Sequence, residues 1–548
     1  MKINRRTLTL LIVCLVFLVL WVWLQHTQQY IYFFREEHQL FLYDSSVFAN
    51  RYIAIGGLAL LLSQWLTQFF VEPLVGSAVT AALCTGSAYA LWRAIPYKNE
   101  AAWWLAPLTF MPVAMQISYL VDSRYHYDGL TALFLASLAL WAWQALSRKL
   151  PRWSWLTATL LAAIVYLLSG PVAVVFVAAV LAIDIVDKPR RMPLGLIAVI
   201  VVMALAVWAV TSAQLEDYHQ ALTYYFYYEA IDPPTIAYSS SWILMLIVVF
   251  IITLLGKWNP KRIAIKSSIA VTTTLLAIIF TVKTEEHNRS SMLLYYRVQH
   301  DANTGQWGDI LQCDDATHGN NYLLRNYVNL ALSHEGQLMQ RFFEYRQPHP
   351  MALCVAGGNS DSTPEVTTLY AQLDYHVGNV SSALDRAFDT FEMLQYGSPQ
   401  MLKIMVKCNL ILGNHRVADK YINMLAKTWA YSDWAEQYRR FIGHPELVSQ
   451  DPELGWQQRN LPKGINGERF IQMEVLFGDL LAIIKANPRN AIARDYAVAF
   501  AVVARQQNMV DELFDLLKSL PQSGEIPQML TQAHDYFHQW DNNKTLEP

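Results

Sequence analysis

Apolar and polar positions divide the chain into two parts of similar length. Long apolar runs fill the first part, among them TLTLLIVCLVFLVLWVWL (7–24) and MPLGLIAVIVVMALAVWAVT (192–211). Each run is close to the roughly 20 residues that a helix needs to cross the hydrocarbon core of a bilayer. No comparable run follows residue 283. The pattern predicts an all-α protein, with a polytopic helical membrane domain over residues 1–282 and a polar helical domain over residues 283–548.

The overall composition supports a membrane protein. Of 548 residues, 54% are hydrophobic and only 16% are charged, which is too apolar for an ordinary soluble chain. The net charge of -3 gives no sign of a nucleic-acid partner. The first apolar run follows the basic segment MKINRR, but no small-residue cleavage pattern comes after it. We therefore expect this run to be an uncleaved anchor rather than a signal peptide.

Basic clusters predict the orientation of the membrane domain, because short loops rich in Lys and Arg face the cytoplasm. Four clusters are assigned to that side: NRR (4–6), SRK with Arg152 (147–152), DKPRR (187–191) and KWNPKR (257–262). The loop 212–240 has no Lys or Arg and is assigned to the outside. The N-terminus is then cytoplasmic, and residues 283–548 are extracytoplasmic, in a protein of the plasma (inner) membrane.

This orientation requires an even number of crossings before residue 147, where five apolar runs occur. We expect YIAIGGLALLLSQWLTQFF (52–70) to lie in the interface instead of crossing. Gly56 and Gly57 interrupt that run, and Gln64 and Gln68 share one helical face. The prediction is about nine crossings in total.

The second part of the chain contains a repeat. GNVSSALDRAFDTFEML (378–394) and GNHRVADKYINMLAKT (413–428) begin about one tetratricopeptide period of ~34 residues apart, and Ala383 and Ala418 keep the same offset. The segments resemble tetratricopeptide repeats, in which glycine ends one helix and a small alanine allows the next to pack closely. Such a solenoid most often binds a peptide, a protein or the membrane domain of its own chain. The alternative is a packing role without a ligand.

Two polar segments are predicted to meet the outer membrane surface: REEHQLFLYD (35–44) and SRYHYDG (123–129). Carboxylates at such a surface can act as a general base, bind a divalent cation or pair with Arg124. A solvated interfacial loop carries the same residue types, so composition does not choose between these roles. The candidate catalytic residues are Glu36, Glu37, Asp44 and Asp128. The cofactor and the metal are unknown at this point, and a divalent cation is one candidate that the carboxylates suggest.

The layout of residues 1–282 resembles the membrane glycosyltransferases of the GT-C superfamily. In that superfamily a first span is followed by an outer loop with an acid, a juxtamembrane segment and further short spans. RYHYDGLTALFLASLALWAW (124–143) resembles the family's R-Y-x-x-D motif at the outer end of a span. The three acids of REEHQLFLYD lie farther beyond the apolar run ending at Leu24 than the family's first-loop acid usually does. The whole chain also resembles a family of bacterial multipass membrane proteins without an established activity.

The resemblance implies a polyprenyl-phosphate sugar as donor, with a first-loop carboxylate taking the proton of the acceptor hydroxyl. It implies that Asp128 orients the acceptor or a metal, and that Arg124 binds phosphate through its forked guanidinium. His126 would bind phosphate or cap the interface. In EDYHQALTYYFYYEAIDPP (216–234), Tyr224 and Tyr225 would stack on a sugar or seat a lipid chain. An interfacial aromatic belt explains these tyrosines as well.

Two other classes of function compete with the transferase. A membrane-anchored scaffold needs only the repeat domain and a protein or peptide partner. A transporter, ranked third, needs charges facing one another near the bilayer midplane, whereas most ionisable residues here lie at the ends of apolar runs. No P-loop, zinc spacing, Gly-x-Ser-x-Gly elbow or dinucleotide fingerprint accompanies these segments.

Overall fold

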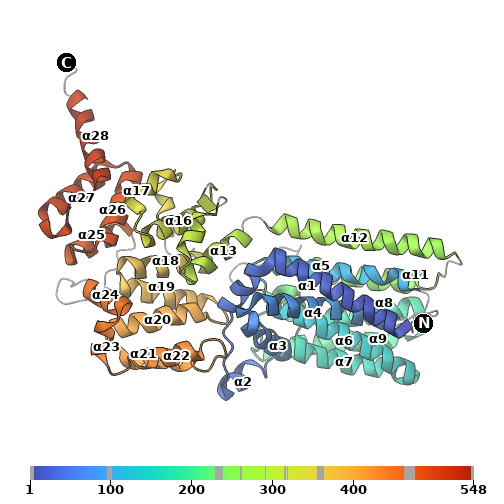
Figure 1. The fold of residues 1–548 in the computed structure, drawn as a ribbon. Helices are drawn as coiled ribbons and strands as arrows, with labels where there is room; N and C mark the ends of the chain where they lie inside the picture. Colours follow the sequence, from blue (N-terminus) through green and yellow to red (C-terminus); the bar gives the residue numbers. More distant parts are fainter. Residues whose placement is uncertain are drawn as a thin grey trace. The chain divides into compact units, whose positions relative to one another are not determined.

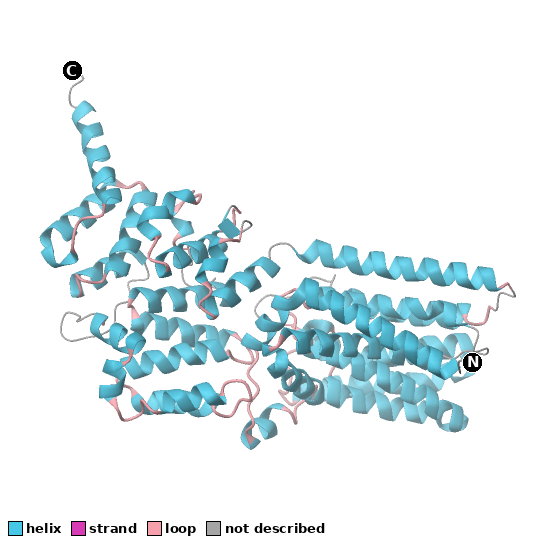
Figure 2. Ribbon diagram, in the orientation of Figure 1, coloured by secondary structure: helices cyan, strands magenta, loops and turns pink. Residues whose placement is uncertain are grey.

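The computed structural model describes residues 5–95, 102–228, 239–258, 262–289, 292–313, 316–317, 319–354, 363–461 and 476–544. The described residues are overwhelmingly helical and contain no strand (Figure 2). Their one sheet-like pairing is an isolated antiparallel bridge between Tyr125 and Tyr228. The predicted all-α class is confirmed.

The chain forms two compact units. The membrane unit comprises Met1–Glu36 and Tyr43–Leu293, and the C-terminal unit comprises Glu37–Leu42 and Leu294–Pro548. A short segment from the first third of the chain is therefore part of the C-terminal unit. Within it, the Leu40 N–H donates a hydrogen bond to the Tyr396 carbonyl at 3.1 Å.

The membrane unit is a bundle of long apolar helices (Figure 1). Its main helices are α1 (Arg5–Glu37), α4 (Pro73–Ala94), α5 (Met111–Tyr119), α6 (Asp128–Lys149), α7 (Ser154–Ser169), α8 (Val172–Asp187), α9 (Met192–Thr211), α11 (Ser240–Leu255) and α12 (Ile263–Arg289). Helix α6 packs against α4, α7 and α8, which makes it the centre of the bundle. Shorter elements of this unit are α2 (Ser45–Arg51), α3 (Gly57–Thr67), α10 (Tyr218–Leu222), η1 (Gln68–Val71) and η5 (Tyr224–Tyr227).

Six helices in the described residues are long and apolar enough to cross a membrane. Helix α1 also leaves large apolar side chains uncovered, with Leu15, Val19 and Val22 between 61% and 66% exposed. An apolar surface of this extent is typical of a lipid-facing helix. The protein is therefore membrane-like, while its orientation and the number of crossings stay predictions.

Two of the predicted apolar runs are not single long helices. Residues 102–119 form the 3-10 helix η2 (Ala102–Phe110) and then α5, and prolines at 107 and 112 remove backbone donors from this segment. The run 52–70 begins with a turn at Gly56 (φ +77°) and continues as α3 and η1. Gln64 of α3 accepts a hydrogen bond from the Tyr52 hydroxyl at 2.6 Å. The interfacial position of this segment stays a prediction.

The C-terminal unit is built from short helices packed in pairs. Its first half contains α13 (Met292–Asn303), α14 (Trp307–Leu311), α16 (Tyr322–His334), α17 (Leu338–Arg341), α18 (Pro364–Val377), α19 (Val380–Met393) and α20 (Pro399–Ile411). The second half contains α21 (His415–Leu425), α22 (Ser432–Arg439), α23 (Pro445–Gln450), α24 (Pro452–Asn460), α25 (Leu476–Ala486), α26 (Ala491–Ala504), α27 (Gln507–Ser519) and α28 (Gln528–Lys544).

The repeated sequence signals occupy equivalent positions in two helical hairpins, α18–α19 and α20–α21. Gly378 (φ +92°) and Gly413 (φ +81°) both adopt the left-handed conformation in the turn between the two helices. Ala383 and Ala418 are both fully buried on the second helix. Each hairpin therefore uses glycine to reverse the chain and alanine to bring the helices close. Membership of the tetratricopeptide class stays a prediction.

The two turn glycines provide a matched stability test. Gly378→Ala would strain the left-handed backbone, and the new Cβ would lie 3.1 Å from the Asn490 amide nitrogen, which itself donates to the Val377 carbonyl. Gly413→Ala carries the same backbone strain but meets no atom within 4 Å. We expect Gly413→Ala to lower stability by about 1 kcal/mol and Gly378→Ala by clearly more. Thermal unfolding of the full chain in detergent measures both, and equal losses would contradict the packing argument.

Candidate functional site

The C-terminal end of α1 is tied to the loop before α6 by Arg35. This buried guanidinium donates hydrogen bonds to the carbonyls of four residues in the 120–125 segment. The acceptors are Leu120, Asp122, Ser123 and Tyr125, with the Leu120 contact at 2.8 Å. Arginine suits this role because its planar fork carries five donors. Arg35 thus joins the two polar segments of the sequence, 35–44 and 123–129, by binding backbone carbonyls of the second segment.

Helix α1 continues beyond its apolar run, which ends at Leu24, and stays helical to Glu37. Only Gln28 departs from helical backbone angles inside it (φ -130°, ψ 19°). Arg35 and Glu36 consequently lie in the last turn of the first long helix, not in an extended loop beyond it. Helix α1 therefore spans the whole distance from Leu24 to Glu36 and Glu37, whereas Asp44 lies beyond the helix.

Asp128 begins α6 and is buried, at 2% exposure. Its Oδ1 has no hydrogen-bond partner among the described residues. The residue after it, Gly129, has no room for a side chain, because a Cβ there would collide with the Tyr125 hydroxyl. That hydroxyl donates to the Gln116 side chain, whose amide in turn donates to Ser241 Oγ at 3.0 Å. A buried polar network therefore surrounds the start of α6.

Tyrosines from the loop after α9 form the other wall of this region. The His126 N–H donates to the Tyr227 carbonyl at 2.9 Å. The Tyr125 and Tyr228 rings approach to 5.0 Å between centroids. The Tyr227 hydroxyl donates to the Ser169 carbonyl and accepts from the Val172 N–H at 3.3 Å. The loop before α6, the α7–α8 turn and η5 are thus bonded together around Asp128.

Electrostatics in this region are dominated by burial. Burial, and then the Asp128 charge, raise the pKa of both Tyr125 and Tyr227 well above the usual value for a phenol. Burial, and then the Arg35 charge, lower the pKa of His126 to about 3. The two phenols and the imidazole are therefore neutral at physiological pH. A neutral imidazole can exchange hydrogen bonds, but it does not add positive charge for a phosphate.

The predicted phosphate ligand Arg124 lies at the edge of this region. Its Nε and Nη2 bind the Asp122 carboxylate, each at 3.1 Å, and its side chain is 34% exposed. Tyr224 is buried and Tyr225 is half-buried, with their ring centroids 5.4 Å apart. The Tyr224 ring also meets the Trp242 ring edge-on at 6.3 Å. These two tyrosines therefore pack in an aromatic group beside the loop.

Two of the other candidate acids have polar partners of their own. Glu37 belongs to the C-terminal unit, where its carboxylate accepts from Asn303 Nδ2 at 2.8 Å and lies 3.4 Å from His300 Nδ1. Asp44 is the N-cap of α2 and accepts from the Ser46 N–H at 2.8 Å. Of the first-segment acids, Glu36 is the one that is buried in the membrane unit.

Sequence reasoning missed Arg35, which organises this region. The residue stood in REEHQLFLYD beside the acids that drew attention, and its position at the end of an apolar helix was the available signal. A cation there must find several acceptors once it is buried.

A family described as a family of unknown function (DUF6057) matches residues 4–547 of the chain. No curated protein and no solved structure matches it.

Arg35 and Arg124 form a matched pair for testing the tie between α1 and the loop. Arg35→Lys keeps the charge but loses the fork, so several buried carbonyls lose a donor. We expect a loss of about 3 kcal/mol or more, since each hydrogen bond to a charged group contributes about 1.5–3 kcal/mol. Arg124→Lys changes a partly exposed ion pair and should cost no more than about 1 kcal/mol. Thermal unfolding in detergent compares the two, and similar shifts would show that Arg35 does not hold the loop.

Proposed function

The chain belongs to the DUF6057 family, and we propose that it is an integral membrane glycosyltransferase of the GT-C type. In this proposal, a sugar passes from a polyprenyl-phosphate donor to an acceptor hydroxyl at the extracytoplasmic face. The acceptor oxygen forms the new bond to the anomeric carbon, and the polyprenyl phosphate leaves. Glu36 takes the hydroxyl proton, while Asp128 orients the acceptor or a divalent cation.

The observation that carries this proposal is the Arg35 contact with the 120–125 loop. Glu36 follows Arg35 in the last turn of α1, and Asp128 follows the bound loop by three residues. The proposal requires exactly these two segments to work together. Glu37 and Asp44 are left out of the mechanism, because one binds partners in the C-terminal unit and the other caps a helix.

The environment of Asp128 adds support. An acid buried at the end of an apolar helix is costly unless a partner or a substrate group solvates it. One oxygen of Asp128 has no partner in the described part of the chain. An acceptor hydroxyl donating to this oxygen would be held in place. Of the tyrosines in this region, Tyr225 is half-buried, and the open part of its ring is a flat surface of the kind that sugars and lipid chains pack against.

A scaffold is the second candidate, and the C-terminal unit carries the observation that favours it. Lys403 Nζ lies 4.2 Å from the centre of the Tyr431 ring and 5.8 Å from that of Trp434. Nearby along the chain, Trp429 is 54% exposed. Tyr431 is buried and Lys403 and Trp434 are half-buried, so Trp429 is the exposed aromatic side chain of this group. An exposed aromatic side chain on a helical repeat is typical of a surface that binds protein or peptide.

Carboxylate-to-amide exchanges test the transferase. In a strain lacking the gene, Glu36→Gln and Asp128→Asn should express normally but slow transfer by about 10² to 10⁴, because a positioned base contributes that much. The measurement is the level of the glycosylated product, together with the accumulated polyprenyl-linked sugar. Asp217→Asn is the control, since Asp217 only caps α10 through the Gln220 N–H at 2.7 Å and asparagine caps equally well.

Full restoration of the product by both acid variants, at normal protein level, would rule out catalysis by these residues. The scaffold hypothesis predicts that outcome. It also predicts that Ala418→Arg, which overpacks a fully buried position in α21, abolishes the phenotype by itself.

Cysteine labelling tests the orientation that the transferase needs. Trp429→Cys places an exposed thiol in the C-terminal unit, and Arg152→Cys places one in a loop assigned to the cytoplasm. A membrane-impermeant maleimide should label the first in intact cells and the second only after lysis. Both are compared with the parent chain, in which Cys14 is exposed, Cys354 is half-buried, and Cys84, Cys313 and Cys408 are buried. The reverse labelling pattern would invert the predicted topology.

A further inference from the structure

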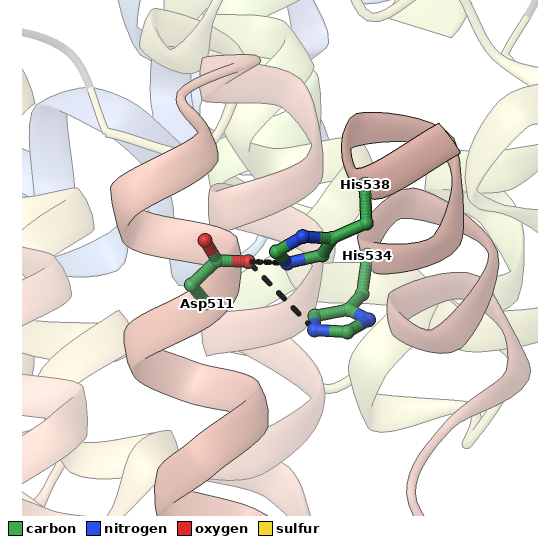
Figure 3. A group of neighbouring side chains, drawn as sticks. All are labelled: Asp511, His534 and His538. Carbon is green, nitrogen blue, oxygen red and sulfur yellow. Dashed lines mark hydrogen bonds and ion pairs between the residues drawn. The ribbon is translucent and has the colours of Figure 1, made fainter. Parts of the chain in front are cut away.

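The last two helices of the C-terminal unit bring two histidines and a carboxylate together (Figure 3). His534 and His538 lie one turn apart on α28, so their side chains project from the same face. Asp511 lies on the neighbouring helix α27 and points toward both rings, as Figure 3 shows. This group takes no part in the transferase proposal and lies entirely within one unit.

Both histidines approach the same oxygen atom, Asp511 Oδ1. His538 Nε2 is 3.1 Å from Asp511 Oδ1, and His534 Nε2 is 3.8 Å from the same oxygen. The three candidate ligand atoms all lie within 4.8 Å of one another. In a tetrahedral zinc site with bonds of about 2.0–2.1 Å, ligand atoms stand about 3.3 Å apart. The two distances from Asp511 Oδ1, 3.1 and 3.8 Å, lie on either side of that value.

A hydrogen-bond network alone accounts for only part of this arrangement. The 3.1 Å contact is a good hydrogen bond from His538, whereas 3.8 Å is too long for one from His534. A cation placed among the three atoms would bind both nitrogens and the carboxylate oxygen together. His534 is held for this role, since its ring stacks on Phe514 with centroids 3.9 Å apart and planes 15° apart.

The surroundings also provide an outer partner for one ligand. His534 Nδ1, on the far side of the ring, lies 3.7 Å from Asp535 Oδ1. Metal-bound histidines commonly donate their other ring N–H to a carboxylate, which fixes the tautomer and the ring orientation. At 3.7 Å the contact with Asp535 is longer than a hydrogen bond, and His534 Nδ1 has no hydrogen-bond partner among the described residues. The group therefore offers three ligands and one candidate for orienting a ligand.

We propose that Asp511, His534 and His538 bind a zinc ion that fastens α28 to α27. Two imidazoles and one carboxylate favour zinc over magnesium or calcium, which prefer oxygen ligands. The fourth position is left to water, because Asp511 and His538 have side chains 30% and 46% exposed. The ion links two helices that otherwise meet through side-chain packing, and so stabilises the last helix of the solenoid.

Metal titration of the full chain tests the proposal. The protein is purified in detergent with a tag that contains no histidine, stripped with a chelator and titrated with Zn²⁺ by calorimetry. One equivalent should bind, and the temperature of unfolding should rise with zinc concentration. His534→Ala and His538→Ala should each weaken zinc binding by at least about tenfold. Losing a residue that only orients a ligand already costs about that much, and these two residues would be ligands themselves.

Controls separate this site from other donors in the chain. His444→Ala removes an exposed histidine that faces a single carboxylate, Glu446 at 3.0 Å, and Asp515→Asn removes an exposed acid one turn along α27. Both controls should bind zinc as the parent chain does. The folding of each variant is checked without metal. If a histidine variant fails to fold, Asp511→Asn replaces it as the ligand variant, because asparagine keeps the size of the side chain.

Cobalt(II) reports the ligands directly. A four- or five-coordinate site of nitrogen and oxygen donors should give visible absorption without a thiolate charge-transfer band. Absence of stoichiometric binding, unchanged affinity in the three ligand variants, or a thiolate band from any of the cysteines would each overturn the proposal. None of these outcomes depends on transferase activity.

Discussion

The requirement to satisfy a buried arginine organises the membrane unit. Arg35 is buried near the end of a helix that has a long apolar run, and leaving its guanidinium without acceptors in such surroundings would be prohibitive. The 120–125 segment meets this need by turning its carbonyls toward one group. Those carbonyls belong to irregular backbone that also requires donors. One side chain therefore satisfies the loop, orients the start of α6 and fixes the end of α1.

The neighbouring acids show that adjacent residues at the end of a helix can belong to different units. Glu36 and Glu37 are adjacent in sequence, but one belongs to the membrane unit and the other to the C-terminal unit. Successive residues of a helix point about 100° apart, so adjacent carboxylates face different surroundings. Glu37 finds Asn303 and His300 in its own unit. A sequence pattern that treats the pair as one acidic motif cannot make this distinction.

The sequence predicts those features that depend on many residues and misses those that depend on one contact. Hydropathy is summed over some 20 positions, so the helical class and the apolar helices were predictable. The repeat was visible because Gly378 and Gly413 perform the same backbone task twice. The partners of Arg35 were not, since they are carbonyls that any residue provides. Asp44 before two serines was a readable helix start. The spacing of His534 and His538 by four residues was also readable, but their approach to Asp511 on another helix was not.

The region around Asp128 is held by backbone and packing constraints instead of ion pairs. Gly129 lets the Tyr125 hydroxyl approach the helix start, and the His126 N–H fixes the loop against the Tyr227 carbonyl. Neither contact consumes the Asp128 carboxylate. A carboxylate held by a salt bridge would have both its position and its charge committed to one partner. Here position is supplied by neighbouring residues, so the open oxygen of Asp128 can be oriented in advance of any group that binds it.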